Sequence, residues 1–395
     1  MKQMHSICFT ILCFFIFIRA GLSRDQTQTV YSIRIVQHDN AWYLNQMNLW
    51  EKEIKKNPKN ADAWYNYYKA IRYANFNEAQ FQEDKLKKFN EILSNMEKYV
   101  PQSFEFALMS YIITQCDQGG SGNDYSWLEE AYRRNPKRTE TYDSFMDRYE
   151  VREPDINNLA KFSKLWYESG EIPSFLLEYN YNVLVSADEN GIIFTHGDND
   201  TYPLWILQQV KGIRRDVTVL NIYQIRGYPE YLFRKLNEKG IALKRQQLPN
   251  GQIDTYLADI SDIIYKQNPD IKIYYALTMH HRYIDFLKDK LFLTGLVNQY
   301  SPRGIDNFAL LKRNILSRYR LDYLSNDWNN ENNISAPLID YMNANYVMPF
   351  MKLAEHLYLS GDEQEAVYLK KVALNLAQKV NINELITFIK SKNFQ

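Results

Sequence analysis

The chain has 395 residues, 45% of them hydrophobic and 24% charged, which is enough for two or three domains with buried cores. Lys plus Arg and Asp plus Glu both number 47, and this balance argues against a nucleic-acid-binding protein, which normally carries a basic excess. The low numbers of glycine (14) and proline (12) disfavour an all-β sandwich or a disordered chain and favour helices.

Residues 1–23 have the pattern of a secretory signal peptide. Lys2 gives a positive start, an apolar run extends from Ile7 to Ile18, and Gly21 and Ser23 form a small-x-small cleavage site. The alternative is a membrane anchor, but the apolar run is shorter than the roughly 20 residues that span a bilayer. We therefore expect an exported protein, periplasmic or associated with the bacterial envelope, with no transmembrane segment in the mature chain.

Cysteine usage indicates a fold without disulfides. Cys8 and Cys13 lie in the predicted signal peptide, so Cys116 alone remains and has no partner for an internal disulfide. Cys116 ends the apolar helical stretch SYIITQC, where we expect an inert thiol in the core.

Residues 24–170 are predicted to form a helical-repeat domain, because hydrophobic residues recur there at three and four positions. The loop 117–124, rich in glycine, is expected to lie inside this helical array. An Asn-Pro-Lys triplet occurs twice, and large apolar residues follow both prolines at the same offsets: Trp64, Tyr67 and Ile71 after Pro58, and Tyr142, Phe145 and Tyr149 after Pro136. This echo is typical of tetratricopeptide-like helix pairs.

Residues 306–395 are predicted to form a C-terminal helical region with a further tetratricopeptide-like pair. Eight positions match the consensus of that repeat: Phe350, Leu353, Ala354, Leu357, Gly361, Ala366, Ala373 and Leu374. Lys370 and Gln378 depart from it, where a large apolar residue and a proline are usual. A generic amphipathic helical hairpin is the alternative.

Residues 171–305 have the texture of an α/β domain. Short apolar, β-branched runs predict strands, and amphipathic segments between them predict helices. The predicted strands are Gly191–Thr195, Asp216–Asn221 and Ile271–Ala276, and the predicted helices are Thr201–Lys211 and Tyr231–Gly240. The fold class is therefore α/β plus all-α, with a small, mostly parallel α/β layer flanked by tetratricopeptide-like helical repeats.

One loop of this domain is a candidate ligand-binding site. It follows the first predicted strand and consists of His196, Gly197, Asp198, Asn199 and Asp200. Open α/β sheets bind their ligands beyond the carboxyl ends of strands, at the start of the next helix. The alternative is purely local, because Asp and Asn also favour turns and caps, and Asp200 is well placed as the N-cap of the next helix.

Side chains outside the loop extend the candidate site. Tyr202 and Trp205 share a face of the next helix and form either a ligand platform or its packing on the sheet. His280 and His281 would join the site if the third strand lay beside the first. Because they are adjacent, they point in different directions and cannot simply chelate one metal. The sequence therefore assigns no metal site, no cofactor and no catalytic residue.

The stretches 180–184, 192–205 and 208–221 contain NYNVL, GDNDTYPLW and GIRRDVTVLN. They resemble the soluble part of a family of Bacteroidota membrane proteins related to protein O-mannosyltransferases, which carry GDNDTxPLW followed by a GIRxDVxVxN strand. The segments 272–278 and 293–302 resemble that family in order and spacing. The family's catalytic acidic residue is expected in a transmembrane half that this chain lacks, so the resemblance implies a free-standing soluble domain and transfers no catalytic residue.

Two functions remain open on this basis. The first is a non-enzymatic exported binding scaffold, whose helical repeats hold an envelope protein or glycoprotein. The alternative is an auxiliary or catalytic component of glycan assembly or protein O-glycosylation, with a polar site at the loop of residues 196–200. We do not expect the protein to bind nucleic acid, and the sequence specifies neither its partner nor its oligomeric state.

Overall fold

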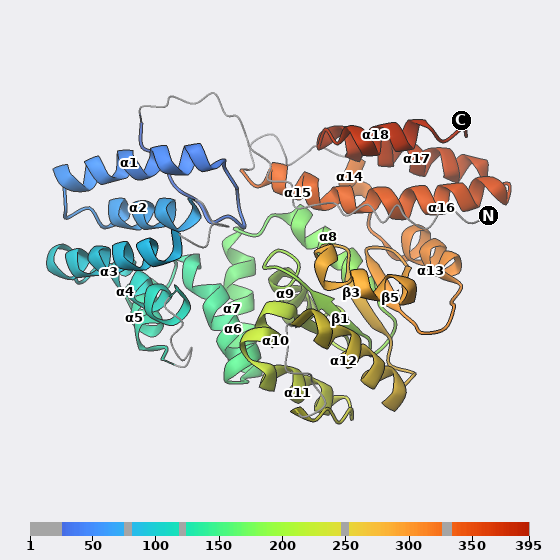
Figure 1. Cartoon of the computed structure of the whole chain (residues 1–395), viewed down its shortest axis with the longest axis horizontal. Coiled ribbons are helices and arrows are strands. Elements are labelled where there is room, and N and C mark those ends of the chain that lie inside the picture. Colours follow the sequence, from blue (N-terminus) through green and yellow to red (C-terminus); the bar gives the residue numbers. More distant parts are fainter. Residues whose placement is uncertain (1–25, 75–80, 118–123, 246–252, 326–333, 395) are drawn as a thin grey trace. The chain divides into compact units, whose positions relative to one another are not determined.

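The computed structural model describes residues 26–74, 81–117, 124–245, 253–325 and 334–394 (Figure 1). The predicted signal peptide, residues 1–23, and most of the predicted loop 117–124 lie outside the described residues. The chain divides into two compact units, with the change from one to the other between Arg148 and Tyr149. In the described parts of both units, no helix combines the length and the apolar character needed to cross a bilayer.

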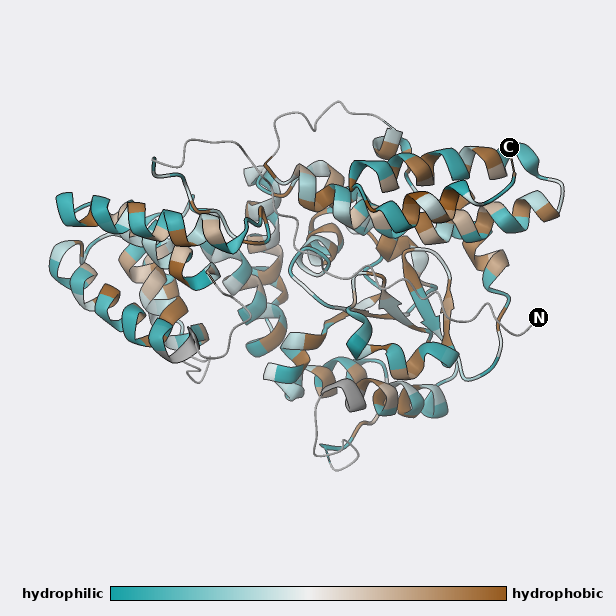
Figure 2. Ribbon diagram, turned by 45° about the horizontal axis from the view of Figure 1, so that its top comes forward, coloured by the Kyte–Doolittle hydropathy of each residue, from teal (hydrophilic) through white to brown (hydrophobic). Residues whose placement is uncertain are grey.

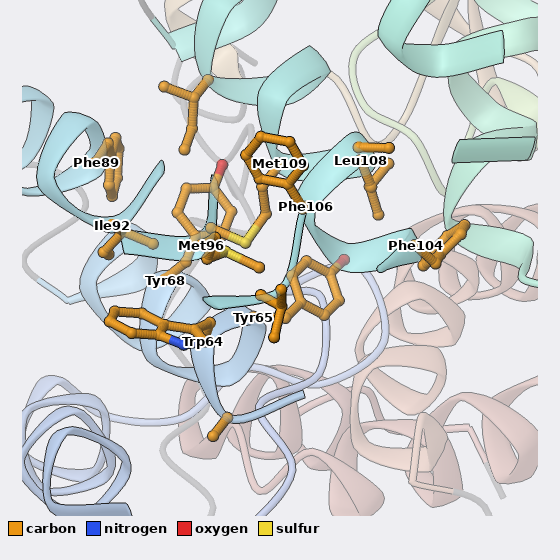
Figure 3. Close-up of a cluster of buried hydrophobic side chains, with 14 of the residues drawn as sticks. Trp64, Tyr65, Tyr68, Phe89, Ile92, Met96, Phe104, Phe106, Leu108 and Met109 are labelled. Carbon is orange, nitrogen blue, oxygen red and sulfur yellow. The ribbon is translucent and has the colours of Figure 1, made fainter. Parts of the chain in front are cut away.

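The N-terminal unit is helical. Its core is rich in aromatic rings, and Figure 3 shows Trp64, Tyr68, Phe89 and Met96 among the side chains that fill it. Its helices are α1 (Asn40–Lys56), α2 (Ala61–Tyr73), α3 (Phe81–Tyr99), α4 (Phe104–Tyr111), η1 (Ile112–Asp117), α5 (Ser126–Arg134), η2 (Thr139–Thr141) and α6 (Tyr142–Asp147). Helix α1 packs on α2, and α4 packs on α5.

The two Asn-Pro-Lys triplets fold into matching turns. In the first, the indole Nε1–H of Trp64 donates to the carbonyl of Pro58 at 2.9 Å. In the second, the hydroxyl of Tyr142 donates to the carbonyl of Pro136 at 2.8 Å, across the same offset of six residues. The sequence echo therefore corresponds to a repeated local structure, whereas the assignment of a tetratricopeptide repeat type stays a prediction.

The expectation that Cys116 is a core thiol is wrong, because its side chain is exposed. It lies in η1, which is a π-helix. A π-helical turn holds more residues than an α-helical turn, so it rotates Cys116 away from the face that buries Ile113.

The C-terminal unit contains a five-stranded sheet with the order β2-β1-β3-β5-β4. Its strands are β1 (Ile192–Thr195), β2 (Thr218–Asn221), β3 (Ile273–Ala276), β4 (Leu291–Leu293) and β5 (Val297–Tyr300). The three predicted strands are present, and β1 pairs in parallel with both β2 and β3. Strand β5 pairs antiparallel with β3 and β4, so the sheet is mixed rather than mostly parallel.

Helices cover both faces of this sheet (Figure 1). From Arg148 to Gln267 the helices are η3 (Arg148–Arg152), α7 (Ile156–Ser169), α8 (Ser174–Ser186), α9 (Tyr202–Lys211), α10 (Ile222–Gly227), α11 (Pro229–Glu238) and α12 (Ile253–Gln267). The hydroxyl of Tyr274 accepts the N–H of Asp188, just after α8, whereas the hydroxyl of Tyr275 lies 2.6 Å from that of Ser261 on α12. Adjacent strand residues point to opposite faces, so α8 and α12 lie on opposite sides.

The rest of this unit is helical. It comprises η5 (His281–Tyr283), η6 (Asp285–Lys290), α13 (Asn307–Arg313), η7 (Asn314–Arg318), α14 (Asp322–Ser325), α15 (Ala336–Asn343), η8 (Ala344–Tyr346), α16 (Val347–Leu359), α17 (Glu363–Lys379) and α18 (Asn383–Lys390). Helices α16 and α17 pack together as the predicted hairpin, and their ribbons carry alternating hydrophobic and hydrophilic bands (Figure 2). Gly361 turns between them with φ of 90°, and Ala354 and Ala366 are fully buried.

Lys370 departs from the repeat consensus for a local reason. Its ammonium group donates to the carbonyls of Lys392 and Phe394, at 2.6 and 2.8 Å, and so ties the segment after α18 to α17. The helical hairpin is established, and its classification as a tetratricopeptide repeat remains a prediction.

Candidate functional site

The carboxyl ends of three parallel strands meet at one edge of the sheet. The chain runs from β1 through α9 to β2 on one side of β1, and later returns to place β3 on the other side. The pairing of Ile192 with Ile273 and of Phe194 with Tyr275 settles that the third strand lies beside the first. Such a reversal of strand order is where open α/β sheets bind ligands.

Asp200 connects the loops at this edge through hydrogen bonds to its buried carboxylate. It is buried, and its carboxylate accepts the backbone N–H groups of His196 at 3.0 Å and Gly197 at 2.6 Å. It also accepts the hydroxyl of Thr278, which lies beyond the end of β3. Burial raises the pKa of Asp200, opposed by these hydrogen bonds. The predicted N-cap role is wrong, since Thr201 occupies the N-cap position of α9 and Asp200 joins two loops.

A second buried network lies below the loop and was missed by the sequence analysis. The hydroxyl of Thr201 donates to the carbonyl of Gly197 at 2.6 Å and lies 2.7 Å from the hydroxyl of Thr195. The side-chain amide of Asn221, at the end of β2, donates to Thr201 at 2.9 Å. The oxygen of that amide accepts the N–H of Tyr223 at 2.8 Å, so the same residue positions the first turn of α10.

The backbone carbonyls of the middle loop residues accept hydrogen bonds from both neighbouring helices. Asp198 is exposed, and its carbonyl accepts the N–H groups of Thr201 and Tyr202 at 3.3 and 3.1 Å. The carbonyl of Asn199 accepts the side-chain amide of Asn180, on α8, at 2.9 Å. These contacts fix the turn into α9.

Tyr202 and Trp205 are buried rather than presented at the edge. Their ring centroids are 5.5 Å apart in an edge-to-face arrangement, and the ring of Trp166 on α7 lies 5.4 Å from that of Tyr202. The two rings therefore contribute to the packing of α9 on α7.

Five side chains beyond the strand ends form what we call the carboxyl-edge cluster: His196, Tyr223, His280, Arg282 and Tyr283. Tyr223 and Arg282 are exposed, whereas Tyr283 is buried. Arg282 donates to the hydroxyl of Tyr283 at 2.6 Å, and that hydroxyl is 3.5 Å from the hydroxyl of Tyr223. Tyr223 in turn is 3.0 Å from Nε2 of His196. The rings of His196 and His280 are 6.5 Å apart. Segments after all three parallel strands thus contribute to one cluster.

The electrostatics of the cluster leave both histidines neutral near neutral pH. Burial, together with the nearby His280 and Arg282, lowers the pKa of His196 to about 4. Burial and the neighbouring His281 and Arg282 also lower the pKa of His280. Burial and the adjacent Tyr283 raise the pKa of Tyr223 to about 12, so its hydroxyl stays protonated.

His281 adjoins the cluster, because its ring centroid lies 4.3 Å from that of His280. Its Nδ1 lies 3.6 Å from the carboxylate of Asp285. Among the residues with described positions, no group of three or more His, Cys, Asp or Glu side chains is arranged to hold a metal ion.

Three members of the cluster were not predicted from the sequence: Tyr223, Arg282 and Tyr283. Tyr223 follows the end of β2 by two residues, and the other two follow β3. Their position after predicted strands was the available signal, but only the neighbouring placement of β1 and β3 brings them together.

Two cavities, of about 630 and 500 Å³, lie where β2 begins, away from the cluster. The guanidinium of Arg214 lines the larger one and donates to the carboxylate of Asp216 and to the carbonyls of Ala187 and Asp188. Arg214 thus ties the end of α8 to the start of β2, and its donors are occupied by the protein itself.

Comparison with known families gives one match, to the family described as TMEM260-associated domain 2, over residues 177–239. This range contains β1, α9, β2 and α11, and with them His196, Asp200 and Tyr223. Among curated proteins, none matches the chain. Over this part of the C-terminal unit, the chain is therefore similar to TMEM260-associated domain 2.

Proposed function

We propose that the chain is an exported, non-enzymatic binding protein that holds a glycoprotein partner in the bacterial envelope. In this proposal the helical hairpins contact the protein part of the partner, and the carboxyl-edge cluster contacts a sugar of its glycan. Export follows from the signal peptide predicted for residues 1–23.

One observation carries the proposal. The buried carboxylate of Asp200 is hydrogen-bonded within the protein, whereas the accessible side chains near it are of types that bind sugars. Asp200 accepts three hydrogen bonds from within the fold, so it is not presented to a ligand. Tyr223 is 44% exposed and offers an aromatic face with a polar tip. Aromatic rings with hydroxyl and imidazole groups suit sugars, which have both apolar faces and hydroxyl edges.

The helical parts support the protein-binding half of the proposal. Paired helices joined by short turns present side chains along extended surfaces, which suits them to hold peptides or protein domains. The two matching turns at Pro58 and Pro136 and the hairpin α16–α17 provide such pairs within the described residues.

Glycan-array binding of the chain from residue 24, compared with a Tyr223→Ala variant, tests the proposal. We expect the wild type to retain a defined set of glycans and the variant to lose them. Tyr31→Ala is the matched control, because Tyr31 is also exposed (39%) but lies in the other unit. Absence of glycan binding by the wild type, or equal binding by both tyrosine variants, would contradict the proposal.

A second candidate function is an auxiliary role in protein O-glycosylation. The match of residues 177–239 favours it, together with the resemblance to proteins related to O-mannosyltransferases. Deletion of the gene would then reduce glycosylation of envelope proteins, and the wild-type chain would restore it better than a His196→Ala variant. Unchanged glycosylation in the deletion strain would exclude this role.

A further inference from the structure

We propose that the group bound at the carboxyl-edge cluster is an anion, namely a phosphate, sulfate or carboxylate carried by a sugar, held by Arg282 with His196 and His280. This inference rests on the proposed function, because it assigns the chemistry of the ligand at the same site.

The hydrogen-bonding of Arg282 is the first ground. Its guanidinium donates to the neutral hydroxyl of Tyr283 and lies over that ring, with 4.7 Å from its central carbon to the ring centroid. Among the ion pairs formed by the described residues, none joins Arg282 to a carboxylate. The side chain is exposed, and a guanidinium carries five N–H donors in a fork geometry that matches oxyanions.

The arrangement of the two histidines is the second ground. Their rings lie 6.5 Å apart, and Arg282 is near enough to both to lower the pKa of each. The amide N–H of Arg282 donates to Nδ1 of His280 at 3.3 Å, which leaves the other ring nitrogen of His280 to donate to a ligand. A bound anion between these groups would pair with the guanidinium and favour the protonated histidines, whereas a cation would oppose both.

Two of the three nearby carboxylates are engaged within the protein. Residues 196–201, 222–227 and 277–285 directly follow the three parallel strands. Their titratable and charged groups are His196, Asp198, Asp200, Tyr223, Arg226, His280, His281, Arg282, Tyr283 and Asp285. Of the three carboxylates, Asp200 is buried in hydrogen bonds to the loop, and Asp285 lies beside His281. Asp198 is exposed on the loop and is the one that an anion would have to avoid.

A linked proton uptake follows from this geometry. An anion beside His196 and His280 favours their charged forms, so binding raises their pKa values and draws protons from the buffer. An uncharged sugar has no such effect. Anionic and uncharged sugars therefore differ in the number of protons taken up on binding, and this number can be measured whatever their affinities.

Isothermal titration calorimetry of the chain from residue 24, at about pH 5.5 in two buffers of different ionisation enthalpy, tests the inference. The probes are glucose 1-phosphate, glucuronate and inorganic phosphate, with glucose as the uncharged counterpart. We expect at least one anionic sugar to bind with proton uptake and more tightly than glucose. Binding of the sugar phosphate alone, or of glucuronate alone, identifies which anion the site takes, and binding of inorganic phosphate shows that the anion suffices without the sugar.

Variants distinguish binding at the carboxyl-edge cluster from nonspecific attraction to surface charge. Arg282→Gln should weaken binding of the anionic probe by roughly tenfold or more, as expected for loss of a charge-assisted hydrogen bond. His280→Gln should reduce the proton uptake, and Arg226→Gln, an exposed arginine on α10 outside the cluster, should change neither. Equal binding of glucose and the anions without proton uptake would overturn the inference and leave the sugar site intact. If no sugar of either class binds here or on the array, the proposed function fails as well.

Discussion

Nε2 of His196 lies 3.0 Å from the hydroxyl of Tyr223, although the two residues follow different strands. The contact exists because β1 and β2 are parallel neighbours, so that their carboxyl ends open onto the same edge. It links the loop after β1 to α10 and, through Tyr283, to the segment after β3. A chain of side-chain hydrogen bonds therefore crosses the edge of the sheet where ligands of open α/β folds bind.

The two acidic residues of the loop should respond differently to amidation. Asp200→Asn leaves one acceptor oxygen for three donors and turns an NH₂ group toward a buried N–H or hydroxyl. We expect it to lower the free energy of unfolding by about 1–3 kcal/mol. Asp198→Asn should lower it by less than Asp200→Asn does, because Asp198 is exposed and its backbone carbonyl is retained. Urea unfolding measures both, and equal effects would contradict the assigned roles.

Gly295, between β4 and β5, should not tolerate a methyl group. Its φ is 145°, and a Cβ atom there would lie 2.0 Å from the hydroxyl of Tyr319. That hydroxyl accepts the N–H of Leu296 at 2.7 Å, so it cannot move away without losing the bond. We expect Gly295→Ala to lower the free energy of unfolding by more than about 1 kcal/mol.

Gly304→Ala is the matched control for this substitution, since a Cβ atom at Gly304 meets nothing within 4 Å. Thermal unfolding should show a lowered Tm for the first variant and an unchanged or raised Tm for the second. A Gly295→Ala variant as stable as the wild type would show that the Tyr319 hydroxyl is not held at this position.

The repeated turn predicts a small and local energetic effect. Tyr142→Phe removes only the hydroxyl that donates to the carbonyl of Pro136. The loss should be about 0.5–1.5 kcal/mol, as for a typical hydrogen bond within a protein. Tyr31→Phe, at an exposed tyrosine of the same unit, should be neutral in the same chemical-denaturation experiment. Two indistinguishable variants would mean that the turn draws no stability from this bond.

The lowered pKa of His196 makes the protein sensitive to acid. Its pKa is about 4 in the folded protein and 6.5 in the unfolded chain, so the unfolded state binds more protons between these values. The contribution of His196 to stability is therefore present at neutral pH and is lost as the pH falls from 6.5 toward 4. We expect the free energy of unfolding to fall less steeply over this range in His196→Gln than in the wild type. Parallel pH profiles would contradict the assigned burial of the ring.

The sequence predicted the elements with strong local patterns. The runs Ile192–Thr195 and Ile273–Ala276 are aliphatic and aromatic apart from Thr195, as expected of strands covered on both faces, and all their residues are buried. Strand β4 has only three residues, each half-buried, and an apolar run of this length is too short to predict a strand. The antiparallel pair β4–β5, and with it the mixed character of the sheet, was therefore missed.

The candidate site could be predicted only as far as local sequence patterns determine it. The loop was located from its place after a strand, but the role of Asp200 depends on Thr278, which is 78 residues later in the chain. An N-cap is a local preference, and here a tertiary contact outweighs it. Arg282 could not be assigned either, since nothing near it in the sequence specifies that β3 lies beside β1.

The most direct test of the binding site is photo-crosslinking in the envelope with p-benzoylphenylalanine in place of Tyr223. We predict a crosslinked adduct that stains for carbohydrate, and no such adduct when the same photoreactive residue replaces Tyr31 in the other unit. Crosslinking from position 31 that equals or exceeds crosslinking from position 223 would contradict the assignment of the carboxyl edge as the ligand site.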